Sequence, residues 1–165
     1  MAGEAETVIS AMTTEDIPRV LAIELASFTT PWSEILFFNE TKKERSIALV
    51  ARKDDAVAGY ICANYVLDEG HILDLAVHPD YRRQGVATLL IREALERLKR
   101  AGCGTVFLDV RASNLAARTM YEKIGFRLCG TRKNYYQKPD EDATLLVLSL
   151  GADSVQPQRG EPFSQ

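Results

Sequence analysis

The spacing of apolar residues divides the chain into segments of two kinds. Short apolar runs bounded by polar turns predict strands over residues 7–12, 46–52, 56–67, 70–77, 105–111, 126–132 and 143–150. Apolar residues that recur every three or four positions predict helices over about 17–25, 33–42, 85–101 and 114–124. This order of strands and helices is typical of an α/β domain built around one mixed sheet.

Two of these helices have a clear buried face. In the helix over 85–101, apolar residues recur every four positions, at Val86, Leu90, Ala94 and Leu98. Two favourably ordered acid–base pairs lie elsewhere on its surface, Glu93/Arg97 and Glu96/Arg100. In the first helix the predicted buried stripe is Ile17, Val20, Leu21 and Leu25. Both helices are therefore expected to pack against the sheet.

The chain has the size of one domain. Its 165 residues allow a single sizeable core, and the pattern shows neither an internal repeat nor a dividing linker. We therefore expect a domain over residues 6–150. Residues 151–165 contain two prolines, two glycines and few apolar side chains, which predicts a flexible tail.

Composition narrows the class of protein. The chain is 46% hydrophobic and 26% charged with a net charge of −3, so a general nucleic-acid binder is disfavoured and a basic protein substrate is permitted. No signal peptide and no membrane-length apolar run is visible, which predicts a cytoplasmic protein without a membrane partner. Cys62, Cys103 and Cys129 have no metal-ligand spacing and are expected to be small apolar side chains, so no metal site is predicted.

A loop that is suited to phosphate follows the strand over 70–77. Pro79 ends this strand, Arg82 and Arg83 supply positive charge, and Gly85 opens the following helix. The unpaired N–H groups and the dipole of a helix N-terminus favour an anion, and a glycine lets the backbone approach it closely. A solvated arginine pair is the simpler alternative. Neither the Walker A pattern nor GxGxxG is present, so a carrier other than a nucleoside triphosphate or dinucleotide is favoured.

Two aspartates lie within predicted buried strands. In the strand over 105–111, Asp109 shares a face with Phe107, opposite Val106, Leu108 and Val110. Asp74 is a second aspartate within a predicted strand, the one that precedes this strand in the chain. A carboxylate at such a position must be solvated or partnered, so each is either a structural acid or a general base that opens onto a cleft.

One helix carries a polar stripe. Asn114, Arg118 and Tyr121 are spaced four and three residues apart and therefore share one face of the helix over 114–124. Tyr121 could simply pack its ring in the core, or its hydroxyl could donate a proton to a leaving group.

Taken together, LAVHPDYRRQGVA, LDVRASN and MYEKIGF resemble the GNAT superfamily of N-acetyltransferases over residues 6–150. The loop matches that family's acetyl-coenzyme A motif, (Arg/Gln)-x-x-Gly-x-(Gly/Ala), at Arg82, Gly85 and Ala87. Further segments are similar to the RimI branch, which acetylates the N-terminal alanine of a small-subunit ribosomal protein: Pro31-Trp32-Ser33, Leu67-Asp68-Glu69, Arg111-Ala112-Ser113-Asn114, and Arg132-Lys133-Asn134-Tyr135-Tyr136 with Asp142-Ala143.

The resemblance implies a fold, a cosubstrate and a set of residues. The fold is a mixed, mostly antiparallel sheet with two parallel central strands that splay apart, flanked by helices. Acetyl-coenzyme A would be bound by Leu75, Ala76, Val77, Arg82, Arg83, Gln84, Gly85, Val86, Ala87, Thr88 and Asn114. Asp109 would be the general base and Tyr121 the acid that protonates the leaving thiolate.

The acceptor rests on weaker signals. The branch usually has glutamate where this chain has Asp109, and the shorter side chain favours a proton relay through water. The implied acceptor is the N-terminal amine of a basic ribosomal protein, held between residues 28–32 and 134–138. Two alternatives stay open: a lysine or small-amine acetyltransferase of the same fold, and a non-catalytic module that binds acetyl-coenzyme A.

Overall fold

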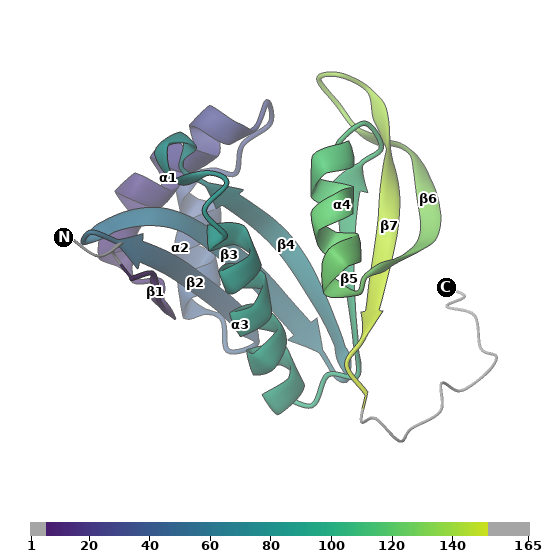
Figure 1. The fold of residues 1–165 in the computed structure, drawn as a ribbon, viewed down its shortest axis with the longest axis horizontal. Helices are drawn as coiled ribbons and strands as arrows, with labels where there is room; N and C mark the ends of the chain where they lie inside the picture. The colour runs from purple at the N-terminus through teal and green to yellow at the C-terminus, as the bar shows by residue number, and fades with distance from the viewer. Residues whose placement is uncertain (1–5, 152–165) are drawn as a thin grey trace.

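The computed structural model describes residues 6–151, which form one seven-stranded sheet with helices on both faces (Figure 1). The strands are β1 (Val8–Ala11), β2 (Ser46–Lys53), β3 (Ala56–Val66), β4 (Glu69–Val77), β5 (Thr105–Arg111), β6 (Arg127–Tyr136) and β7 (Glu141–Ser149). They lie in the order β1-β2-β3-β4-β5-β7-β6, and only β4 and β5 run parallel. The predicted mixed, mostly antiparallel sheet is confirmed. The predicted tail lies almost wholly outside the described residues.

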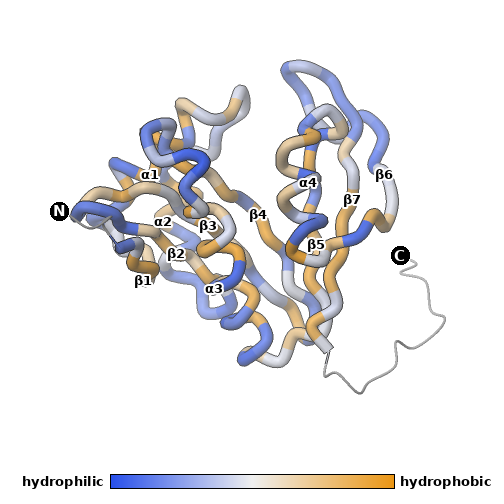
Figure 2. Tube along the Cα trace, viewed as in Figure 1, coloured by the Kyte–Doolittle hydropathy of each residue, from blue (hydrophilic) through white to orange (hydrophobic). Residues whose placement is uncertain are grey.

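Two apolar cores lie on opposite faces of the sheet. Helices α3 (Val86–Arg100) and α4 (Leu115–Ile124) cover one face, and α1 (Ile17–Ser27) and α2 (Glu34–Lys42) cover the other. Two short 3₁₀ turns, η1 (Thr14–Asp16) and η2 (Pro79–Tyr81), precede α1 and α3. Figure 2 shows apolar residues along the central strands and along β7, and hydrophilic residues in the turn that joins β6 to β7.

The central parallel pair is short. Only Glu69, Gly70 and His71 of β4 pair with β5, opposite Thr105, Val106 and Phe107. Beyond this point β4 continues along β3 and β5 along β7, and the two strands diverge (Figure 1). The divergence leaves the facing edges of both strands without a sheet partner, so these edges are available to a ligand.

A β-bulge at Leu73 changes the direction of the side chains that follow. Cys62 of β3 pairs with Asp74 and Ala63 pairs with Ile72, so Leu73 is the extra residue of β4. Without a bulge, residues 72 and 74 would face the same side, because side chains alternate along a strand. With it, Ile72 packs against α3, whereas Asp74 lies on the face that α1 and α2 cover.

Most element boundaries lie within two residues of the prediction, and the hairpin differs most. Strand β6 extends to Tyr136 rather than ending at Arg132, and β7 begins at Glu141 rather than Ala143. Strand β6 is exposed along most of its length, so it shows no apolar alternation, and its pairing with β7 forms it. The predicted pairs Glu93/Arg97 and Glu96/Arg100 of α3 are confirmed at 3.0 and 3.9 Å.

One burial prediction was wrong. Leu25 is 60% exposed, and Glu24 takes the buried position beside it in α1 with 2% exposure. Cys62, Cys103 and Cys129 are all free; the first two are buried, and Cys129 is exposed on the edge strand β6.

The close approach of β3 to β4 and α3 gives a test of this packing. A Cβ on Gly59 would lie 2.9 Å from the Ala76 carbonyl oxygen and 3.3 Å from side-chain atoms of Val86 and Leu90. We expect Gly59→Ala to lower the free energy of unfolding by about 1–3 kcal/mol, as overpacked cores do. Urea denaturation measures this change. The matched control Gly104→Ala has no atom within 4 Å of the added Cβ, and its effect should stay within about 0.5 kcal/mol.

Candidate active site

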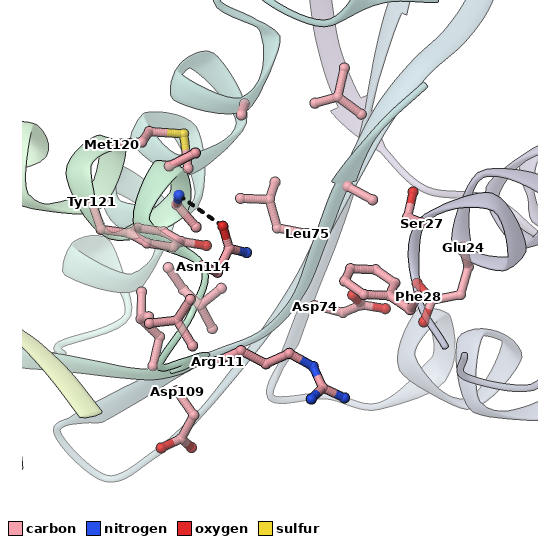
Figure 3. A pocket seen from close by; sticks show the side chains of 18 of the residues that line it. Glu24, Ser27, Phe28, Asp74, Leu75, Asp109, Arg111, Asn114, Met120 and Tyr121 are labelled. Carbon is pink, nitrogen blue, oxygen red and sulfur yellow. Dashed lines mark hydrogen bonds between the residues drawn. The ribbon is translucent and has the colours of Figure 1, made fainter. Parts of the chain in front are cut away.

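The divergence of β4 and β5 opens into a cavity of about 1040 Å³ (Figure 3). Its walls come from the end of α1 and the loop after it, the second halves of β4 and β5, the η2–α3 loop, the start of α4 and the β6–β7 hairpin. Every predicted site residue except Gln84 lines this cavity. One site therefore collects residues from positions 24 to 141 of the chain.

The loop between β4 and α3 is held open by its backbone geometry. Gly85 caps α3 in the left-handed region with φ +81°, and no atom lies within 4 Å of a Cβ built there. Gly85 and the first-turn residues Val86, Ala87 and Thr88 line the cavity, and the unpaired N–H groups of a helix N-terminus favour an anion. Arg83 is also left-handed, with φ +64°.

Two predicted loop residues have contacts within the protein. Arg82 Nε donates to the Val77 carbonyl at 3.1 Å, which ties the loop to the end of β4. Gln84 Nε2 donates to the Asp80 carbonyl at 3.3 Å, and its Oε1 accepts from Lys53 Nζ at 2.6 Å. These contacts give both side chains a role in shaping the loop.

Helix α4 presents Asn114 and Tyr121 to the cavity. Asn114 caps the helix: its Oδ1 accepts from the Ala117 N–H at 3.1 Å, and its amide nitrogen lies at the cavity wall (Figure 3). Tyr121 packs edge-on against Phe126 with ring centroids 5.5 Å apart. Burial raises the pKa of Tyr121, with a smaller contribution from the charge of Asp74, so its hydroxyl keeps its proton at neutral pH. Arg118 of the predicted stripe forms an ion pair with Glu122 at 3.6 Å and does not line the cavity.

The two strand aspartates lie in different surroundings. Asp109 Oδ1 accepts from Arg132 Nε of β6 at 2.9 Å, and in Figure 3 its carboxylate points away from Asp74. Asp74 is 8% exposed and lies on the α1–α2 side of the cavity. The bulge at Leu73 produces this separation.

Sequence reasoning missed Glu24, which is the most buried acid of the site. Its Oε1 accepts from the Tyr60 hydroxyl, and its Oε2 accepts from the Trp32 N–H at 2.8 Å. These bonds fix the loop from Phe28 to Trp32, which forms one wall of the cavity. Position 24 lies four residues after Val20, on the buried face of α1, and an acid at such a position is the signal that could have found it.

The opposite wall is the β6–β7 hairpin. Arg111 at the end of β5 donates to the carbonyl groups of Gln137 and Pro139 at 2.8 and 2.9 Å and pairs with Glu141 at 3.2 Å. Its guanidinium also lies 4.6 Å from the ring centroid of Tyr136. Hydrogen bonds from the Ser113 side chain, the Ser113 N–H and Arg111 lower the pKa of Glu141, which therefore remains an anion in this network.

Within residues 6–151, no group of three His, Cys, Asp or Glu residues is arranged to hold a metal ion. None of the helices in this part of the chain is both long and apolar enough to cross a membrane.

Comparison with known proteins agrees with this geometry. The acetyltransferase (GNAT) family model matches residues 17–126. The ribosomal protein bS18–alanine N-acetyltransferase of Salmonella typhimurium is 37% identical over 144 residues, which cover 86% of this chain and 97% of that protein. The crystal structure of the ribosomal-protein-S18-alanine N-acetyltransferase from Escherichia coli superposes with a TM-score of 0.81 at 34% identity, covering 92% of this chain and 99% of that one. Arabidopsis thaliana NAA60 in complex with acetyl-CoA shares the fold, with a TM-score of 0.81 at 22% identity over 89% of this chain and 100% of that one.

The chain belongs to the GNAT family of acetyltransferases. Within that family its relatives include the bS18–alanine N-acetyltransferases, which it matches over nearly their whole length. It is an N-acetyltransferase, and its acetyl donor is acetyl-coenzyme A, the thioester that supplies the acetyl group. The cavity fits this donor, since an open helix N-terminus can receive the pyrophosphate and the unpaired edge of β4 can receive the amide groups of the pantetheine arm.

The two ends of α3 provide a matched test of the loop. Gly85 and Gly102 are both left-handed, with φ +81° and +101°, and a Cβ on either meets no atom within 4 Å. Alanine at either position should cost about 1 kcal/mol of stability, because the left-handed region is strained for residues with a Cβ. Only Gly85→Ala should also weaken acetyl-coenzyme A, by about tenfold in Kd. Calorimetric titration measures this difference, and equal affinities of the two variants would remove Gly85 from the binding site.

Proposed function

We propose that this enzyme acetylates the N-terminal alanine of ribosomal protein bS18. The observation that carries the proposal is the 37% identity to an enzyme of that name over 97% of its length. A cytoplasmic location and a basic protein partner follow from this acceptor. An acidic chain with a net charge of −3 suits a basic partner.

The shape of the cavity supports a peptide acceptor. The loop from Phe28 to Trp32 and the hairpin that carries Tyr136 and Pro139 form two opposed walls of the same cavity that receives the donor loop. Bonds to Glu24 fix the first wall, and bonds to Arg111 fix the second. An extended N-terminus can therefore enter between walls that are already ordered, which reduces the cost of binding.

The cavity supports direct transfer from donor to acceptor. None of the three cysteines lines it, so no cysteine of the described chain is placed to carry the acetyl group. The acceptor nitrogen attacks the thioester carbonyl carbon, which an N–H near Val77 polarises. The carbon–sulfur bond breaks, and Tyr121 gives its hydroxyl proton to the thiolate. Tyr121 suits this role because it is protonated and lines the cavity.

Asp109 removes the proton of the amine through water in this proposal. Its Oδ1 is engaged by Arg132, and its carboxylate points away from Asp74 in Figure 3, so a relay suits it better than direct contact. A modest base is sufficient for an α-amine. With a pKa of 7.7–8.0, deprotonation at pH 7 costs about 1–1.4 kcal/mol, against about 4.6 kcal/mol for a lysine with a pKa of 10.4.

A peptide comparison tests the acceptor. With acetyl-coenzyme A and mass detection, a peptide with the alanine-led N-terminus of bS18 should gain one acetyl group. An N-terminally blocked peptide that contains lysine should gain none. Preference for the blocked peptide would replace this proposal by lysine acetylation. Transfer to neither peptide nor to small amines, with the donor still bound, would indicate a non-catalytic binding module.

Removal of the Tyr121 hydroxyl group tests its proposed role as the general acid. Tyr121→Phe keeps the ring that packs against Phe126 and removes the proton donor. We expect kcat to fall by about 10²–10⁴-fold, the usual contribution of general acid–base catalysis, while the Kd of acetyl-coenzyme A stays unchanged. Steady-state kinetics together with calorimetry separate the two quantities. An unchanged kcat would exclude Tyr121 from the chemical step.

A further inference from the structure

Two buried carboxyl groups meet at the acceptor side of the cavity. Glu24 of α1 is 2% exposed and Asp74 of β4 is 8% exposed, yet both line the cavity beside Phe28. In Figure 3 their side chains point toward one another. Because the bulge at Leu73 turns Asp74 to the α1–α2 face, this contact is a consequence of the β4 backbone.

This pair lacks the positive partner that other buried acids of the protein have. Among the described residues, the buried acids are Asp16, Glu24, Glu40 and Asp74. Asp16 pairs with Arg52 at 2.7 Å, and Glu40 pairs with Lys43 at 2.9 Å. In the described part of the chain no Lys, Arg or His forms an ion pair with Glu24 or Asp74.

The polar contacts of the pair leave one oxygen unsatisfied. Glu24 accepts from the Tyr60 hydroxyl and the Trp32 N–H, both of which are neutral donors. Asp74 Oδ2 is buried and has no hydrogen-bond partner within the protein. A buried charge without a cation and a buried oxygen without a partner are both costly, so the site is incomplete as the protein stands alone.

The two carboxyl groups of the pair do not titrate alike. Burial, a hydrogen bond with Glu24 and the charge of Glu24 raise the pKa of Asp74 to about 9, so Asp74 holds its proton at neutral pH. Tyr60 and Cys62 of β3 and Tyr121 of α4 face the pair from other elements and carry no positive charge. Arg111 of β5 lines the same cavity, but its guanidinium is paired with Glu141 at 3.2 Å. The acceptor end of the cavity is therefore negative.

We propose that the Glu24–Asp74 pair binds the α-ammonium group of the acceptor and so selects a free, charged N-terminus. This inference rests on the proposed function and assigns that function a recognition site. An α-amine with a pKa of 7.7–8.0 is mostly protonated at pH 7, and its small cation can supply both the charge and the hydrogen-bond donors that the pair lacks.

The alternative explanation of the buried pair is a purely structural role, here called a brace, in which it only stabilises the loop, since Glu24 also fixes the loop at Trp32. The two explanations differ in their dependence on charge. A brace needs hydrogen bonds, which amide side chains can also make, whereas recognition of an ammonium group needs the negative charge.

Three variants separate these explanations. Asp74→Asn replaces one carboxyl group of the pair and keeps Glu24, so the KM of an alanine-led peptide at pH 7 should rise by less than in the double variant. The double variant Glu24→Gln/Asp74→Asn keeps polar groups but removes the charge, and the KM should rise about tenfold or more. Glu40→Gln is the matched control: this buried glutamate lies outside the cavity, and its loss should leave the KM unchanged. The Kd of acetyl-coenzyme A, equal in all four proteins, reports intact folding.

The pH dependence of KM gives the decisive readout. At about pH 8.5 the α-amine is mostly neutral while most Asp74 still holds its proton, so the difference in KM between wild type and the double variant should shrink by about threefold or more. A defect that is equally large at pH 7 and pH 8.5 would show that the pair has only a structural role and overturn the proposal, as would a double variant with the wild-type KM.

A competition experiment on the wild-type enzyme tests the proposal even if the double variant does not fold. A desamino peptide, with hydrogen in place of the α-amino group, should compete with the alanine-led peptide at least about tenfold more weakly at pH 7 than an amine-bearing inactive analogue. Equal competition would overturn the proposal. Absence of any wild-type turnover of the alanine-led peptide is a different result, which refutes the proposed function and this role with it.

Discussion

The separation of β4 from β5 is the constraint on which the site depends. Each strand pairs fully on its outer side, β4 with β3 and β5 with β7, but their mutual pairing ends at His71 and Phe107. The sheet remains one cooperative unit, while two strand edges at its centre stay free for a ligand. Helices α3 and α4 begin beside these free edges, so the loop before α3 and Tyr121 of α4 line the same cavity.

The cavity is also electrically divided. Its donor side has arginines and an open helix N-terminus, which favour phosphate. Its acceptor side has the buried pair of Glu24 and Asp74 without a cation. Under the proposed roles, the positive end of the cavity suits an anionic donor and the buried carboxyl pair suits an ammonium acceptor.

Local patterns identified most of the loop residues that line the cavity. A phosphate loop is a continuous segment whose function depends on its own backbone, so Gly85 and its neighbours could be identified from their order in the chain. The helix spacing of Asn114 and Tyr121 likewise placed both on α4. The acceptor half could not be predicted in this way, because Glu24 becomes buried only through contacts with Tyr60, Trp32 and β4. The exposure of Leu25 has the same cause, since hydrophobicity alone assigned that face of α1.

The amino-acid sequence by itself determined the α/β class, the order of the elements, the family resemblance and the position of the donor loop. Periodicity and turn chemistry act over a few residues and can be followed along the chain. The tertiary structure decided where β4 leaves β5, that a bulge at Leu73 turns Asp74 toward Glu24, and that Asp109 pairs with Arg132. These features depend on strand register and on contacts between segments more than twenty residues apart, and neither is encoded in the spacing of residues within one segment.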